Sequence, residues 1–146
     1  MDENAIARTL EQIPYTLQMG IVVDRAASGE VHMTLADETA HQNMVGIVHA
    51  GALYTFGETV AGIAAGFDFL DRAFPLARNA EIRYLRPARG TIRGSARVSS
   101  NDSERVALEL DSKGRSELSV AVSLDDAEGQ TVVEMDVHYS FRSREK

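Results

Sequence analysis

The chain has 146 residues, of which 44% are hydrophobic, and a formal net charge of −7. This length and composition suit one compact domain over residues 1–146, and the negative charge argues against nucleic-acid binding. There is no cysteine, which excludes disulfides, thiolate nucleophiles and cysteine-ligated zinc. The acidic start, MDENAIARTLEQI, lacks the pattern of a signal peptide, and the low-charge segment 44–57 is too short and glycine-rich to span a bilayer. We therefore expect a cytoplasmic protein with no membrane partner.

The first part of the chain predicts one helix and two strands. Residues 3–13 place apolar side chains at helical spacing, and Pro14 ends that helix. Residues 19–26 and 29–36 follow as strands around a Ser-Gly turn. In the second strand apolar and polar residues alternate, which is the pattern of a strand with one buried face.

A long segment of small and apolar residues, HAGALYTFGETVAGIAAG, predicts a helix over residues 49–66 after a loop over 37–48. Each interior glycine costs roughly 1 kcal/mol relative to alanine. Close approach of the backbone to a sheet, a ligand or a partner could offset that cost, and so could tight helix–sheet packing alone. A helix with little charge on any face must be covered almost all round, whereas one sheet covers one side. We therefore expect at least a dimer.

The remainder of the chain predicts mostly strands. They span residues 79–87, 91–99, 117–125 and 131–142. The first two are joined through RPARG and the last two through an Ala-Glu-Gly turn. The segment 102–112 is ambiguous, although the capping residues before it and Gly114 after it are compatible with a short helix. Strands on both sides of one long helix favour the α+β class, with an antiparallel sheet packed on that helix.

Glu58 is the only charged residue of the long helix and the first candidate for catalysis. Helical spacing places it on the same side as Gly51, Thr55 and Gly62, in a groove of small residues with room for a reacting group. A carboxylate in this position could act as a general base, or it could be a buried glutamate with a backbone or arginine partner.

The nine-residue spacing between His49 and Glu58 corresponds to a rise of about 13.5 Å and a turn of roughly 900° on an ideal helix. The two side chains of one chain then point in opposite directions. If they share a site, the second component must come from another subunit.

The loop HQNMVGIV before the helix supplies Asn43 and Gly46, and the helix start supplies backbone N–H groups from about Ala50. Such N–H groups suit a developing oxyanion. Taken singly, an asparagine in a loop is usually a turn residue and a histidine at a helix start is often a cap.

A basic segment lies between Arg72 and Arg97, with seven arginines and one acidic residue, Glu81. It could be a solvated face of a sheet. It could also be a contact zone for a phosphorylated ligand, because guanidinium groups suit phosphate oxygens.

The pattern Asn43-x-x-Gly46-x-x-His49-x-Gly51, followed by Glu58, resembles the signature of the hotdog-fold thioesterases of the PaaI-like, phenylacetic-acid-degradation type acyl-CoA thioesterase group. In that group the pattern is Asn-x-x-Gly-x-x-His-Gly-Gly with an acidic residue nine positions after the histidine. The stretch EIRYLRPARG is similar to the group's strand after the long helix. The resemblance implies a curved antiparallel sheet of about six strands wrapped around the helix and a homodimer or homotetramer.

The resemblance also implies an activity, the hydrolysis of an acyl-CoA thioester without a metal or another cofactor. Glu58 of one subunit would be the general base or nucleophile. The other subunit would supply Asn43 to orient the thioester or water, His49 to hold the loop or contact the thioester, and the N–H of Ala50 to polarise the carbonyl. The same resemblance implies a substrate-binding surface, which comprises Gly46, Gly51, Arg86 and Arg89, the two arginines contacting phosphates of CoA.

Three positions depart from the group's pattern. Ala50 follows the histidine where many members have glycine, and Ala77 lies where some members have a serine or threonine that assists the water. Glu58 replaces an aspartate in part of the group, which moves the carboxylate outward by about one methylene.

Two other functions remain open. The chain could be a hotdog protein that binds acyl-CoA without catalysis, or a hotdog hydratase or dehydratase. The stretch LADETAHQN contains Asp37 and His41, but without the proline and spacing that such enzymes usually carry. The acyl group, the choice between CoA and acyl-carrier protein, and the choice between dimer and tetramer are not determined by the sequence.

Overall fold

The computed structural model describes residues 3–144 and is built around a six-stranded sheet. The strands are β1 (Ile21–Ala27), β2 (Glu30–Leu35), β3 (Ala73–Tyr84), β4 (Ile92–Arg97), β5 (Arg115–Asp125) and β6 (Thr131–Ser143). The helices are α1 (Glu3–Glu11), α2 (Pro14–Leu17), α3 (Ala50–Gly66) and α4 (Ser100–Lys113), with a 3-10 turn, η1, at Thr39–His41.

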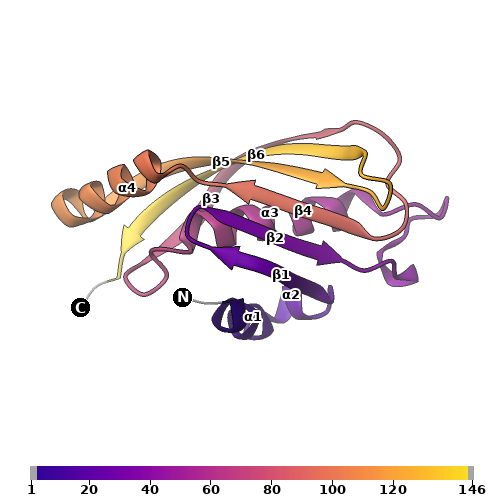
Figure 1. Ribbon diagram of the computed structural model, residues 1–146, viewed down its shortest axis with the longest axis horizontal. Helices are drawn as coiled ribbons and strands as arrows, with labels where there is room; N and C mark the ends of the chain where they lie inside the picture. The colour runs from indigo at the N-terminus through magenta and orange to yellow at the C-terminus, as the bar shows by residue number, and fades with distance from the viewer. Residues whose placement is uncertain (1–2, 145–146) are drawn as a thin grey trace.

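The strands are arranged in the order β1-β2-β4-β5-β6-β3, and every neighbouring pair is antiparallel. One face of the sheet curves around α3, which packs against β2, β3, β4, β5 and β6 (Figure 1). The short helices α1 and α2 lie beside β1, whereas α4 packs against β5 and β6 (Figure 1). This arrangement confirms the predicted α+β hotdog fold.

The alternation of apolar and polar residues in the last strand determines which face contacts the helix. Val133, Met135, Val137, Tyr139 and Phe141 are all buried, whereas the polar residues between them are more accessible. Because side chains alternate between the two faces of a strand, this set faces α3. These five residues of β6 belong to the hydrophobic core.

α3 packs very closely on β4 at Gly94. A Cβ atom at this position would lie 2.9 Å from a methyl of Val60, 3.0 Å from Leu124 and 3.1 Å from the ring of Phe56. Real Cβ atoms essentially never lie as close as the first distance and rarely as close as the other two, so a side chain at position 94 would force these neighbours to shift.

β3 begins earlier than the sequence pattern predicted, at Ala73 rather than residue 79. Pro75 made the first part of this strand hard to predict, because proline cannot donate a hydrogen bond to a β-ladder. The structure accommodates it because β3 is an edge strand that pairs only with β6.

The connection RPARG does not join two neighbouring strands. β3 lies at one edge of the sheet, whereas β4 lies between β2 and β5. The connecting loop is held at both sides: the Leu85 N–H donates to the Val132 carbonyl (2.8 Å), and the Val48 N–H donates to the Ala88 carbonyl (2.9 Å). The second of these hydrogen bonds places the loop beside the segment that precedes α3.

The ambiguous segment 102–112 is part of α4. Ser99 caps this helix, since its hydroxyl oxygen accepts a hydrogen bond from the Asp102 N–H at 3.1 Å. Gly114 ends the helix with a φ of +66°. Within residues 3–144, no helix combines the length and apolar character required to cross a bilayer.

Candidate active site

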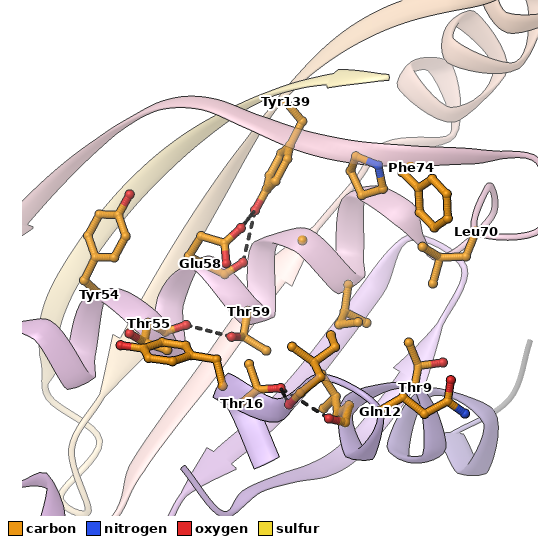
Figure 2. A pocket seen from close by; sticks show the side chains of 16 residues that line it. Thr9, Gln12, Thr16, Tyr54, Thr55, Glu58, Thr59, Leu70, Phe74 and Tyr139 are labelled. Atoms are coloured by element: carbon orange, nitrogen blue, oxygen red, sulfur yellow. Dashed lines mark hydrogen bonds between the residues drawn. The ribbon is translucent and has the colours of Figure 1, made fainter. Parts of the chain in front are cut away.

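A cavity of about 590 Å³ lies between α3, the N-terminal helices and the start of β3 (Figure 2). Among the residues of the range 3–144 that line it, Glu58 is the only one with a charged side chain. Thr55 and Gly62 lie beside Glu58 on the α3 side of the cavity, as expected from the sequence, whereas Gly51 does not line it. The other lining residues are Tyr54, Thr59 and Ile63 of α3, then Thr9, Leu10, Gln12, Ile13, Tyr15, Thr16, Leu70, Phe74, Pro75 and Tyr139.

Tyr139 holds the carboxylate of Glu58. Its hydroxyl donates to Glu58 Oε1 at 3.1 Å and lies 3.0 Å from the backbone carbonyl oxygen of Glu58 (Figure 2). Tyr139 is only 1% exposed. Burial, and then the charge of Glu58, raises the pKa of Tyr139 far above that of a free phenol. The phenol therefore stays protonated and remains a hydrogen-bond donor to the carboxylate.

Gly62 makes room for this pair. A Cβ atom at position 62 would lie 3.3 Å from the Tyr139 hydroxyl oxygen and 3.6 Å from Glu58 Oε1. Helical spacing predicted that Gly62 lies in the groove beside Glu58. Two explanations were open for the interior glycines of the helix: close approach of the backbone to another group, or tight helix–sheet packing alone. The structure shows that the close approach here is to the hydroxyl of a side chain from β6.

The sequence did not indicate a role for Tyr139. The non-catalytic alternative for Glu58 was a buried carboxylate with a backbone or arginine partner. The available signal was that Tyr139 alone carries a hydroxyl among the inward-facing residues of the last strand. In the sheet register Tyr139 lies directly opposite Ala77, the position where the resemblance suggested a serine or threonine. A hydroxyl therefore reaches Glu58 from the neighbouring strand.

Asn43 and Gly46 form a turn before α3. The Asn43 side-chain oxygen accepts hydrogen bonds from the N–H groups of Val45 (3.0 Å) and Ile47 (3.3 Å). The Gly46 N–H donates to the Asn43 carbonyl at 3.0 Å, and Gly46 has a φ of +74° that favours glycine. Asn43 thus has the turn role that its residue type suggested.

His49 is the N-cap of α3 rather than its first residue. Its Nδ1 accepts a hydrogen bond from the Gly51 N–H at 2.8 Å, and its own N–H donates to the His41 carbonyl at 2.7 Å. Ala50 is the first residue of the helix, so its N–H has no acceptor within the helix. The Ala50 carbonyl accepts a hydrogen bond from the Tyr84 hydroxyl at 3.1 Å. The hydrogen bond between His49 Nδ1 and the Gly51 N–H therefore holds the imidazole next to the Ala50 N–H, which has no acceptor within the helix.

Arg86 and Arg89 lie in the loop after β3, which contacts the start of α3 through the Val48–Ala88 hydrogen bond. Both are exposed, and Arg86 donates to the side-chain oxygen of Gln130 at 2.9 Å. Neither makes an ion pair with a residue of the described range 3–144. Other arginines of the basic segment are paired with acids: Arg72 with Asp111, Arg83 with Glu81, Glu134 and Asp136, and Arg97 with Glu30.

One chain therefore brings the candidate residues together in two separate groups. Glu58 and Tyr139 lie at the cavity, whereas the turn of Asn43, the cap His49 and the Ala50 amide lie at the start of α3 and do not line that cavity. Ideal helix geometry separates Glu58 from the helix start by roughly 12 Å or more.

The Asp37–His41 stretch is also away from the cavity. His41 is buried, and its Nδ1 lies 3.3 Å from the Ala36 carbonyl oxygen. The arrangement contains no acid–imidazole pair at Glu58 of the kind that the hydratase alternative would use.

Residues 4–140 match a protein family described as "Domain of unknown function (DUF4442)". No curated protein matches this sequence. The fold is similar to that of Pseudomonas aeruginosa PA5026, described as a protein of unknown function and probable thioesterase (TM-score 0.82, 25% identity, 99% of this chain and 97% of that chain).

Two further structures share the fold at lower identity. They are a protein of unknown function, OLEI01261, from Chlorobaculum tepidum (TM-score 0.83, 14% identity, 98% of each chain) and a mutant of the Pseudomonas aeruginosa thioesterase PA1618 (TM-score 0.79, 11% identity, 99% of this chain and 96% of that chain). At these identities the likeness shows the fold alone.

Proposed function

The chain belongs to the DUF4442 family, and we propose that it is a thioester hydrolase with Glu58 as its general base or nucleophile. The observation that carries the proposal is the single carboxylate in an apolar cavity, held by a buried tyrosine hydroxyl. The similarity to PA5026, described as a probable thioesterase, supports it. The finer assignment to the PaaI-like acyl-CoA thioesterases depends on the motif of Asn43, Gly46 and His49 followed by Glu58.

The reaction needs few groups beyond these. As a general base, Glu58 takes a proton from a water molecule, and the water oxygen forms a bond to the thioester carbonyl carbon. The tetrahedral intermediate carries negative charge on the former carbonyl oxygen, which an N–H such as that of Ala50 would stabilise. The carbon–sulfur bond then breaks, the thiolate takes up a proton, and a carboxylic acid and a thiol are released.

A second copy of the chain would complete the site. β3 has a strand neighbour on one side only and exposes apolar side chains, among them Leu76 at 55%, whereas the other edge strand, β1, lies beside α1. A long open edge of this kind is a template for pairing with another strand. We propose a homodimer or a homotetramer in which the partner's Asn43, the partner's His49 and the partner's Ala50 face the Glu58 of the first chain.

An acyl-CoA is the proposed substrate. Arg86 and Arg89 are exposed, free of acidic partners among the described residues, and close to the start of α3. Their guanidinium groups would bind the phosphates of CoA. An acyl-carrier protein is acidic and would be repelled by a chain with a net charge of −7.

The test is the release of free thiol from a panel of acyl-CoAs by the wild type, by Glu58→Gln and by Glu104→Gln. Glutamine keeps the size of the side chain and can still accept from Tyr139, but it cannot take a proton. General-base catalysis contributes about 10²- to 10⁴-fold, so the rate should fall by at least about 100-fold in Glu58→Gln. Glu104 is exposed on α4 and does not line the cavity, so its variant should keep the wild-type rate.

Two results would contradict the proposal. Hydrolysis by Glu58→Gln at the wild-type rate would show that Glu58 is neither base nor nucleophile. If the wild type releases no thiol from any acyl-CoA while the same compounds raise its melting temperature, the chain is an acyl-CoA-binding protein without this activity.

A further inference from the structure

We propose that the N-terminal helices α1 and α2 form the binding wall for the hydrocarbon chain of the acyl group, and that Ile13 limits the length of that chain. This inference rests on the proposed function, because it identifies the cavity beside Glu58 as the acyl subsite. It concerns a part of the chain outside the motif that suggested the activity.

The N-terminal helices are a fixed wall rather than a loose covering. Ile6 and Leu10 of α1 are 0% and 5% exposed and belong to the same core as α3 and the sheet. Thr9 and Gln12 lie on the far side of the cavity from Glu58, which projects into it from α3 (Figure 2). A ligand in the cavity would therefore contact α1 and α2 on one side and the Glu58 carboxylate on the other.

Three threonine hydroxyls of the cavity wall are occupied by the chain itself, and the wall also contains the polar side chains of Gln12, Tyr15, Tyr54 and Thr55. The hydroxyls of Thr9, Thr16 and Thr59 donate to backbone carbonyls of Ala5 (2.9 Å), Ile13 (3.2 Å) and Thr55 (2.7 Å). With their hydroxyls bound in this way, the threonines offer mainly methyl groups to a ligand. A wall of methyl groups and apolar side chains favours a hydrocarbon and disfavours a charged or strongly polar group.

Ile13 is suited to determine chain length. It lines the cavity, is 40% exposed, and is not a member of the buried core, so its size can be changed without opening a void in the core. It directly precedes Pro14, which begins α2, and this places it at the junction of the two helices. A larger side chain here would shorten the space available to a ligand.

Leu17 offers a matched control. It belongs to α2, is 57% exposed and does not line the cavity. Replacing Ile13 or Leu17 by tryptophan adds the same bulky side chain to the same segment, inside the cavity in one case and outside it in the other.

The experiment uses non-hydrolysable S-alkyl-CoA thioethers with chains of 4, 6, 8, 10 and 12 carbons, and measures their dissociation constants by calorimetry. In the wild type, affinity should increase with chain length up to a maximum and then stop increasing. Ile13→Trp should move this maximum to a shorter chain by at least one member of the series and weaken binding of the wild type's preferred thioether about tenfold. Ile13→Ala should move it to a longer chain, and Leu17→Trp should leave it unchanged.

Release of thiol from the matching acyl-CoAs is measured in parallel and separates the two proposals. A shift of the binding maximum without any hydrolysis by the wild type would support the acyl subsite and contradict the thioesterase activity. Hydrolysis with the same chain-length preference in the wild type, Ile13→Trp and Ile13→Ala would support the activity and overturn the role of Ile13. Affinity that does not depend on the alkyl chain in the wild type would also overturn the inference.

Discussion

The residue pair Glu58 and Tyr139 places a hydrogen-bonded carboxylate in the wall of the cavity. A hydrogen bond from the phenol restricts the carboxylate to one orientation, and Gly62 leaves the space that this bond requires. Because burial raises the pKa of Tyr139, its hydroxyl donates throughout the pH range in which enzymes normally work. If Glu58 is the base, as proposed, Tyr139 is a positioning residue, since it would act on the substrate through Glu58.

Replacement of Tyr139 by phenylalanine tests this role. A hydrogen bond to a charged group is worth about 1.5–3 kcal/mol, so kcat should fall by about 10- to 100-fold with KM nearly unchanged. Steady-state kinetics measures both kcat and KM.

A merely structural role for Tyr139 predicts a different result. The melting temperature of Tyr139→Phe would then fall, but kcat of the folded variant would stay near the wild-type value. An unchanged kcat in a stably folded variant would likewise show that the hydroxyl does not serve Glu58.

At the scale of the elements, the contact between α3 and β4 determines how closely the helix packs on the sheet. This contact depends on Gly94, where a Cβ atom would lie 2.9 Å from Val60 and 3.1 Å from Phe56, both on the helix. The same depth brings Glu58 level with Tyr139 on β6. The register of the helix against the sheet is therefore a condition for the Glu58–Tyr139 hydrogen bond.

Gly94→Ala should destabilise the protein by about 1–3 kcal/mol, because a methyl group added to a tightly packed core forces its neighbours out of position. Urea denaturation measures the change in the free energy of unfolding. Ser95→Ala is the control, since Ser95 is the next residue of β4, points to the opposite face and should change this free energy by less than about 0.5 kcal/mol. Equal stability of Gly94→Ala and the wild type would show that α3 can move away from β4 without cost.

At the scale of the whole molecule, one group of candidate residues lies at the start of α3 and the other at the middle of α3. Because α3 is a regular 17-residue helix, His49 stays about 13.5 Å along the helix axis from the Glu58 of its own chain. A dimer formed through the open edge of β3 offers a route, because it would place the helix start of one chain opposite the middle of the helix of the other.

Mixing two defective variants tests the shared site. Asn43→Ala and Glu58→Gln should each be inactive alone, and subunit exchange between them should restore activity. Random pairing makes half of the dimers mixed, and each mixed dimer would contain one intact site of two, so recovery should approach about a quarter of the wild-type rate. Thiol release after incubation of the mixture, compared with each variant incubated alone, gives the result. No recovery despite exchange, verified with a tagged copy of one variant, would indicate a site within one chain.

The sequence by itself determined the elements and their faces. Periodicity is a local property, so the alternation in β6, the apolar character of α3 and the isolated charge of Glu58 could be read directly. The spacing from Asn43 to Glu58 also pointed to the hotdog fold that the structure confirms.

Only the tertiary structure decided which of these elements meet. It placed β3 at an edge and β4 inside the sheet, and it brought Tyr139 to Glu58 across 81 residues of chain. It also added residues 9–16 to the wall of the cavity. The physical reason is that such contacts depend on how closely helices and strands pack, at positions such as Gly62 and Gly94, and no local pattern in the chain records that packing.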